Sequence, residues 1–444
     1  MSAANVSSSL KNLAIRGTLW TFVGYGAGRI LSFGSQLVLT RLLAPEVFGL
    51  MALVNTFLIG LQLFSDVGIG PSIIQNDRGD EPEFLNTAWT IQVIRGVALW
   101  LCACIGAWPF AQFYEQPELF ALIIVSGLSA VISGFNSTSL FTANRQLTLG
   151  RLTLIELVSQ AASLVVVLHW VLHYPNVWGL VAGSMFGVLV KMILSYRWLP
   201  GIHHQFTWDW KAVQSLTKFG RWIFLSTALG FFLQYADRLV LGKFLSISEL
   251  GIYSLAVLLA GVIQDIHNRV NQNVLLPVYS KLKHIPIEEL RRKVRKLRLA
   301  MMAVLLPPIW VSAIFGTFII DWLFDSRYHQ AGWMFQVLSA GLAVSVSSII
   351  GPFFLAFGDS FTLLYLLVVR SIALFGSMIA GALLYDTTGL ICGIAIHNLV
   401  FYPFLVAVYR KYSLWIPWLD ALGMLSSAVI ITAGLYLVNT HVGG

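Results

Sequence analysis

The sequence predicts an all-α, polytopic membrane protein made of two parallel six-helix lobes followed by an extra C-terminal span. Three observations predict this fold: an apolar composition, a series of long apolar runs, and an internal repeat with an offset of 202 residues. The chain of 444 residues is 57% hydrophobic and only 11% charged. Soluble proteins average about 25% charged residues, so the composition alone indicates a membrane protein.

The internal repeat is clearest between residues 20–53 and 222–255, which align without a gap and share ten of 34 positions. The matches include a tryptophan and two glycines, Gly28 and Gly49 in the first copy, and Arg41 aligns with a lysine. An even number of spans per copy gives both copies the same orientation. Parallel repeats of this kind are a known architecture of transporters.

Apolar runs of about 20 residues or more predict the membrane spans. There are thirteen such runs, near residues 17–39, 48–74, 86–110, 118–141, 150–173, 177–198, 214–241, 248–275, 297–323, 330–357, 361–384, 387–409 and 415–437. They divide the chain into an N-terminal lobe (1–198), a cytoplasmic linker (199–213), a C-terminal lobe (214–409) and an additional span with its tail (410–444).

Basic residues predict the orientation of the chain in the bilayer. With the N-terminus in the cytoplasm, 19 of the 28 Lys and Arg residues fall in cytoplasmic segments and three in outer segments. The net charge of +8 therefore indicates a positive-inside bias and not a nucleic-acid partner. The densest basic stretch, residues 281–298, is either a topology determinant or a surface that gathers an anionic lipid substrate, and Pro286 favours a helix start within it.

Ten ionisable residues fall within the predicted spans, where each costs at least ~2.5–3.5 kcal/mol unless it faces protein or water. A guanidinium there has two uses: it holds a buried carboxylate, or it binds the phosphate of a substrate. The four candidates for the second use are Arg29, Arg95, Arg269 and Arg370. The acidic candidates for an ion pair or a coupling ion are Asp66, Glu156, Asp237 and Asp265.

Two of these acidic residues have informative neighbours. Asp66 lies in a stretch that ends at Gly70 and contains two glycines, which allow unwinding or a close backbone approach. Asp265 and Arg269 are four residues apart, so they share a helix face and are close enough to pair.

Motifs for catalysis and cofactor binding are absent from the sequence. It contains no Gly-x4-Gly-Lys-[Ser/Thr] phosphate loop, no His-Glu-x-x-His zinc motif and no Gly-x-Ser-x-Gly nucleophile turn. The three cysteines lie in apolar runs without metal-ligand spacing. We therefore expect a protein that is not an enzyme, binds no metal and needs no cofactor.

Several motifs resemble a known family. The stretch Leu39-Thr-Arg-Leu-Leu-Ala-Pro-Glu-x-Phe-Gly49, the glycine-flanked segment 66–70 and the segments 237–243 and 251–253 are similar to those of polysaccharide-transporter (Wzx-like) flippases. These flippases belong to the multidrug/oligosaccharidyl-lipid/polysaccharide exporter superfamily.

The resemblance implies a specific function. It implies transport of undecaprenyl-diphosphate-linked oligosaccharide across the bacterial inner membrane by alternating access, for exopolysaccharide, capsule or O-antigen synthesis. It also implies a lipid-bilayer setting, with a polysaccharide polymerase and a chain-length regulator as partners.

Three alternatives remain open. A lipid II flippase would differ only in its cargo. A cation-coupled multidrug exporter of the same superfamily should show an acid-rich interior, whereas the ten charges within the spans are six basic and four acidic. A membrane polysaccharide polymerase or ligase should carry a large outer loop, and the outer connections predicted here are short.

Overall fold

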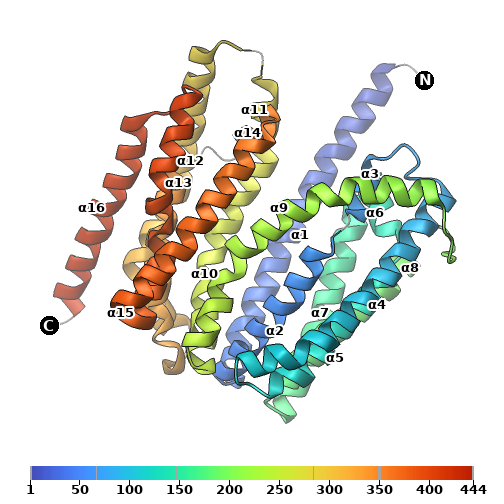
Figure 1. Ribbon diagram of the computed structural model, residues 1–444, viewed down its shortest axis with the longest axis horizontal. Coiled ribbons are helices and arrows are strands. Elements are labelled where there is room, and N and C mark those ends of the chain that lie inside the picture. The colour runs from blue at the N-terminus through green and yellow to red at the C-terminus, as the bar shows by residue number, and fades with distance from the viewer. Residues whose placement is uncertain (1–2, 67, 147, 284, 349–351, 443–444) are drawn as a thin grey trace. The chain divides into compact units, whose positions relative to one another are not determined.

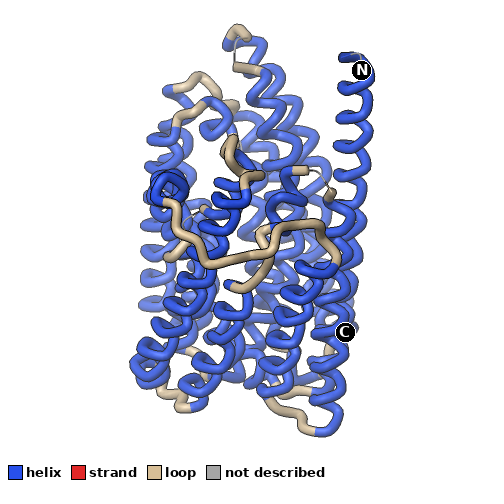
Figure 2. The backbone as a smooth tube through the Cα atoms, turned by 90° about the vertical axis from the view of Figure 1, so that its right-hand side faces the viewer, coloured by secondary structure: helices blue, strands red, loops and turns tan. Residues whose placement is uncertain are grey.

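The computed structural model describes the whole chain except residues 1–2, 67, 147, 284, 349–351 and 443–444. Every regular element in the described part is helical (Figures 1 and 2). Nine of the described helices are long and apolar enough to cross a membrane, or ten if one bent pair is a single span. Large apolar side chains point outward, such as Leu383 and Phe361, which are 82% and 81% exposed. The prediction of an all-α, multi-pass membrane protein is confirmed.

The chain divides into two compact units, residues 1–231 and 232–444, and the boundary falls within α9 (Trp210–Phe244). The other helices of the first unit are α1 (Ala3–Leu42), α2 (Pro45–Phe64), α3 (Ile69–Gln75), α4 (Pro82–Phe113), α5 (Glu118–Gly134), α6 (Ser139–Arg145), α7 (Leu149–His173) and α8 (Val177–Arg197). Those of the second are α10 (Ile247–Val270), the π-helix η1 (Asn271–Leu275), α11 (Leu276–Lys281), α12 (Ile287–Leu323), the 3-10 helix η2 (Ser326–Tyr328), α13 (Ala331–Ser348), α14 (Phe353–Phe357), α15 (Ser360–Lys411) and α16 (Pro417–Val442).

Helix starts follow from local sequence. Both α2 and α4 begin at a proline, which lacks the N–H that a first helical residue leaves unpaired. Helix α10 begins with a capping box, in which Ser246 and Glu249 satisfy each other's backbone N–H groups. Helix α12 starts directly after Pro286, as expected, and carries the basic stretch into the following span.

Two spans predicted as continuous are interrupted, and for these the prediction is wrong. The predicted span 48–74 is divided into α2 and α3, and 118–141 into α5 and α6, whose axes differ by 58°. In the second unit, the span predicted at 248–275 runs on through the π-helix into α11, and the one predicted at 330–357 corresponds to α13 and α14, which together are long and apolar enough for one span. Both interrupted spans therefore belong to the first unit.

Helix α15 shows the reverse difference, because it contains two predicted spans. Its 52 residues would be about 78 Å long as a straight helix, far more than a bilayer core of ~30 Å. The backbone is non-helical at Tyr385 and Asp386, between the spans predicted at 361–384 and 387–409. The two halves then pack closely through Gly381 and Gly389, where an added Cβ would lie 2.0 Å from the facing carbonyl oxygen.

In the first unit, a close approach of α4 and α5 sets the position of a polar cavity. A Cβ on Gly96 would lie 2.5 Å from the backbone oxygen of Ala130, and one on Gly134 would lie 3.0 Å from that of Gln92. Only glycine permits this distance between the two backbones. The side chains of α4 are thereby held against the end of α5. At the same end of the unit, α3 and α6 pack against each other (Figure 1).

Candidate functional site

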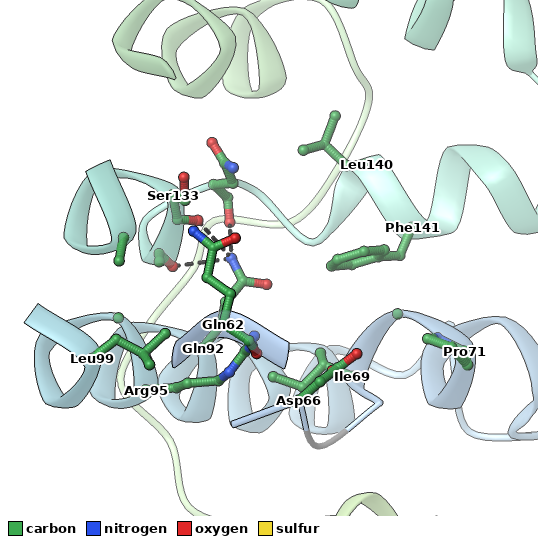
Figure 3. Close-up of a pocket in the computed structure, with 15 residues that line it drawn as sticks. Gln62, Asp66, Ile69, Pro71, Gln92, Arg95, Leu99, Ser133, Leu140 and Phe141 are labelled. Carbon is green, nitrogen blue, oxygen red and sulfur yellow. Dashed lines mark hydrogen bonds between the residues drawn. The ribbon is translucent and has the colours of Figure 1, made fainter. Parts of the chain in front are cut away.

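The first unit contains a cavity of about 360 Å³ beside both of its interrupted spans (Figure 3). The two helix breaks and α4 supply its walls. Lining residues are Gln62, Asp66, Ile69, Gly70, Pro71, Gln92, Arg95, Gly96, Leu99, Ala130, Ser133, Gly134, Asn136, Leu140 and Phe141. In transporters, interrupted helices often mark the substrate or ion site, because their freed backbone groups and side chains face a polar space.

The break between α2 and α3 is built by Asp66 and two glycines. A carboxylate oxygen of Asp66 accepts the backbone N–H of Gly68 at 2.9 Å, and Gly68 has φ = +68°, in the left-handed region that favours glycine. Two residues later, a Cβ on Gly70 would lie 2.8 Å from the ring of Phe141 on α6. The sequence therefore both unwinds the span and lets α6 approach it.

Arg95 of α4 holds the end of α2. Its Nε donates to Ser65 Oγ at 3.0 Å, and its Nη2 donates to the carbonyl oxygen of Gln62 at 2.7 Å. Asp66 lies near enough for its charge to attract the guanidinium, and both side chains line the cavity. Within the described part of the chain, Arg95 Nη1 has no hydrogen-bond partner. Two of the three guanidinium nitrogens are therefore hydrogen-bonded to the protein, and Nη1 is available to a ligand.

Gln92 makes the corresponding contact with the end of α5. Its Nε2 donates to the carbonyl oxygens of Ser133, Gly134 and Asn136 at 3.2, 3.0 and 3.1 Å, which the break leaves without helical partners. Two acceptors in the cavity wall, Gln92 Oε1 and Asn136 Oδ1, are buried and have no hydrogen-bond partner within the described chain. Buried polar atoms are nearly always paired, so these two oxygens point to a ligand or water that donates hydrogen bonds.

The α8–α9 segment, residues 198–209, packs against α4. The backbone N–H groups of Gln205, Thr207 and Asp209 each donate, at 3.1 Å, to a side-chain oxygen of α4. Backbone N–H donation from Lys211, together with the Arg78 guanidinium 3.0 Å away, holds the pKa of Asp209 below its usual range.

His204, in the same segment, lies at the start of α6. Its ring stacks on Trp89, with centroids 5.4 Å apart, and its Nε2 accepts the backbone N–H of Thr138 at 3.3 Å. Burial lowers the pKa of the His204 ring, which keeps it neutral and able to accept. His204 is therefore part of the packing that supports the α5–α6 break.

Six of the eight predicted site residues lie elsewhere than in the cavity wall, and three of them make contacts on their own helices or with a neighbouring helix. Arg29 is on α1, where its Nε donates to Tyr25 Oη at 3.1 Å. Glu156 of α7 is exposed, and its carboxylate lies 3.5 Å from Lys191 Nζ. In the second unit, Asp237 accepts the hydroxyl of Tyr253 at 2.7 Å, and its other oxygen is buried and unpaired in the described structure.

The remaining candidates are in the second unit, on two helices. Asp265 and Arg269 lie one turn apart on α10, both half-buried. Arg370 of α15 has no ion-pair partner within the described residues, and its Nε is buried without a hydrogen bond. Its charge acts on two histidines, His267 of α10 and His397 of α15. Among the described residues, the positive charge of Arg370 is thus paired with no carboxylate.

Several important residues were missed by sequence reasoning. Gln92 and Asn136 carry no charge, so a search for ionisable residues within spans does not find them. Arg298 was counted with the cytoplasmic basic stretch, yet it is 2% exposed and paired with Asp420. The offset of about 202 residues from Arg95 was the available signal for Arg298.

Comparison with known proteins agrees with this organisation. A family model described as "Polysaccharide biosynthesis protein" matches residues 38–332, which include every residue of the cavity wall. The chain belongs to the polysaccharide biosynthesis protein family. The resemblance predicted from the motif at 39–49 is thereby confirmed.

Two proteins named for polysaccharide biosynthesis are similar to this chain over most of their length. The chain is 24% identical to the lipopolysaccharide biosynthesis protein WzxC of Escherichia coli (strain K12), over 92% of this chain and 85% of that protein. It is 22% identical to the succinoglycan biosynthesis transport protein ExoT of Rhizobium meliloti (strain 1021), over 80% and 71% of the two chains.

Solved structures show the fold of this family member. The lipid II flippase MurJ, in an inward closed conformation, superposes with a TM-score of 0.73 at 13% identity, over 94% of this chain and 92% of that one. An inward-facing multidrug resistance MATE transporter of the MOP superfamily gives 0.64 at 15% identity, over 92% and 95%. At these identities the likeness establishes the fold alone.

Proposed function

We propose that this protein is a flippase that moves an undecaprenyl-diphosphate-linked oligosaccharide across the bacterial inner membrane by alternating access. The N-terminus is cytoplasmic, and the product feeds exopolysaccharide, capsule or O-antigen synthesis. The relatives support this proposal, because WzxC is named for lipopolysaccharide biosynthesis and ExoT for succinoglycan transport. On this proposal the protein carries its substrate unchanged and is not an enzyme.

The observation that carries the proposal is the polar cavity beside two interrupted membrane spans. A charged and amide-lined space at such breaks is costly in a protein that only packs helices, since every polar group there must be satisfied. It is the expected feature of a protein whose cargo has a polar head. The cavity is too small for a polyprenyl chain, which we place in the lipid.

Arg370 is our candidate for binding the diphosphate. Its guanidinium has no acidic partner in the described residues, and the ring nitrogens of the neighbouring His267 and His397 can also donate hydrogen bonds to a phosphate. Arg29 and Arg269 stay candidates for phosphate contacts.

We also propose that residues 199–213 act as a cytoplasmic linker between lobes 1–198 and 214–409, and that 410–444 forms an added span. A polysaccharide polymerase and a chain-length regulator are the proposed protein partners.

A leaflet assay in cells tests this function. In a deletion strain, radiolabelled lipid-linked oligosaccharide should accumulate on the cytoplasmic face of the inner membrane. Wild type should restore transport, whereas Arg370→Gln and Arg29→Ala should restore it poorly at equal membrane abundance. Accumulation of lipid II instead would show a peptidoglycan cargo. A change in drug tolerance without accumulation of either lipid would contradict the proposal.

A further inference from the structure

Two hydrogen-bond acceptors in the wall of the first unit's cavity have no partner within the described structure. Gln92 Oε1 and Asn136 Oδ1 are buried and unpaired in the described structure, and Asp66 adds a carboxylate. The orientation of the Gln92 amide is fixed, because three carbonyl oxygens surround its nitrogen. Its oxygen must therefore face away from them, toward a group that donates.

The cationic hydrogen-bond donor in the wall, Arg95, is already engaged by the protein. Its Nε donates to Ser65 and its Nη2 to Gln62, and the negative charge of Asp66 offsets the positive charge of the guanidinium. A diphosphate at neutral pH presents acceptors and negative charge, so it would leave both amide oxygens unpaired and would be repelled by Asp66. This chemistry argues against the initial prediction that Arg95 binds diphosphate.

We propose that the cavity is a saccharide subsite that binds an uncharged sugar of the lipid-linked cargo, with Gln92 and Asn136 as specificity-determining residues. Sugar hydroxyls and acetamido N–H groups donate to the two amide oxygens and to Asp66, while the remaining nitrogen of Arg95 donates to a sugar oxygen. The ring of Phe141 offers an apolar surface to the C–H face of the sugar (Figure 3). This inference rests on the proposed function and names the part of the substrate that this site recognises.

The size of the cavity agrees with a small saccharide. Small-molecule sites span roughly 300–1,000 Å³, and the cavity of about 360 Å³ lies at the lower end of that range. Its four converging polar side chains and one aromatic ring are the mixture that fixes the orientation of a polar ligand.

Asn136 gives the sharper test, because its side-chain oxygen has no partner to lose. Asn136→Leu removes a buried unpaired acceptor while the backbone oxygen that Gln92 uses stays in place. The variant should therefore be at least as stable as wild type without ligand. Ser126→Ala is the matched control, since Ser126 Oγ is also buried and unpaired on α5 but does not line the cavity.

The experiment measures binding of two probes to the full chain in nanodiscs: undecaprenyl diphosphate, and the same lipid carrying one N-acetylhexosamine. The ratio of the two affinities is the sugar increment. Asn136→Leu should lower this increment by about tenfold, as expected for one buried hydrogen bond, and leave binding of the bare lipid unchanged. Ser126→Ala should change neither quantity. Asn136→Ser, which keeps a polar group, should retain part of the increment and serves if the leucine variant fails to fold.

Distinct results would overturn the subsite and the proposed function. If wild type binds both lipids equally well, the flippase proposal stands and the saccharide subsite is wrong. The subsite is also wrong if the variants at Asn136 keep the full increment, or weaken both lipids by the same factor. If wild type binds neither lipid above a control membrane protein, both proposals fail.

Discussion

Arg298 of α12 and Asp420 of α16 form an ion pair that is almost fully buried, with 2% and 1% of the side chains exposed. The guanidinium also donates to the carbonyl oxygen of Ser347 on α13, and Asp420 accepts the hydroxyl of Tyr402 on α15 at 3.0 Å. Four helices of the second unit thus meet at one pair of charges. The last helix, α16, is held to the unit through its acidic first turn.

We expect loss of either charge to destabilise the second unit strongly. Arg298→Met leaves Asp420 buried without its cation, which typically costs about 3–5 kcal/mol. Unfolding of purified protein by heat or denaturant measures this cost. A double variant, Arg298→Met with Asp420→Leu, should recover much of the stability, because it leaves no uncompensated charge. Equal stability of wild type and the single variant would contradict this assignment.

Gly96→Val should impair folding and transport together. A side chain there meets the backbone of Ala130 at 2.5 Å, and backbone cannot rotate away, so α4 and α5 must separate. Overpacking of this kind costs about 1–3 kcal/mol, and here it also displaces the cavity wall. Gly34→Ala is the control, because a Cβ at Gly34 meets nothing within 4 Å. Gly96→Val should lower both the thermal unfolding temperature and transport in the leaflet assay, whereas Gly34→Ala should leave both unchanged.

Arg95→Lys should loosen the junction of α2 and α3. A lysine reaches one of the two oxygens that the arginine now satisfies, leaving the Gln62 carbonyl or Ser65 hydroxyl unpaired at a cost of about 1–3 kcal/mol. Hydrogen exchange should therefore quicken in residues 62–68 and stay unchanged in α7. Unchanged exchange at the junction would show that Arg95 does not hold it.

Docking of the α8–α9 segment should weaken in acid. Burial lowers the pKa of His204 below its ordinary 6.5, so the unfolded segment binds protons more readily than the docked one. The stabilisation is complete above that ordinary pKa and is lost as pH falls below it. Proteolysis of residues 199–209 should therefore accelerate between about pH 7.5 and pH 5.

Histidine variants provide the controls for this pH effect. His204→Gln should remove the pH dependence, whereas His203→Gln, at an exposed neighbour, should retain it. A pH dependence that persists in His204→Gln would assign the effect to another group.

The sequence predicted the general fold well because apolar length and charge asymmetry are one-dimensional signals. It failed at the interruptions, since a run such as 118–141 is apolar enough on average to predict one span, while its backbone bends at the polar residues Asn136, Ser137 and Thr138. That bend depends on Gln92, which lies more than forty positions away in the chain and carries no charge. A search for charges within spans finds Arg95 and Asp66 but not the amides beside them.

The same limitation explains why the sequence predicted the same phosphate-binding role for all four arginines within the spans. Arg95 and Arg370 look alike in sequence, yet one is bonded to the end of a helix and the other has no acidic partner within the described residues. Only three-dimensional contacts separate a structural cation from one available to an anion. Residue type and depth in the span do not.

The second span of each repeat departs from a regular α-helix, but in different ways. In the first unit a glycine with positive φ and an aspartate break the span, whereas in the second unit the helix continues through a π-helical turn at Asn271–Leu275 that precedes Pro277. The i→i+5 hydrogen bonds of a π-helical turn enclose one more residue than those of an α-helix, so the side chains that follow it point in other directions than they would on an unbroken α-helix. The residues of α11 therefore face different neighbours from those that a straight continuation of α10 would give them.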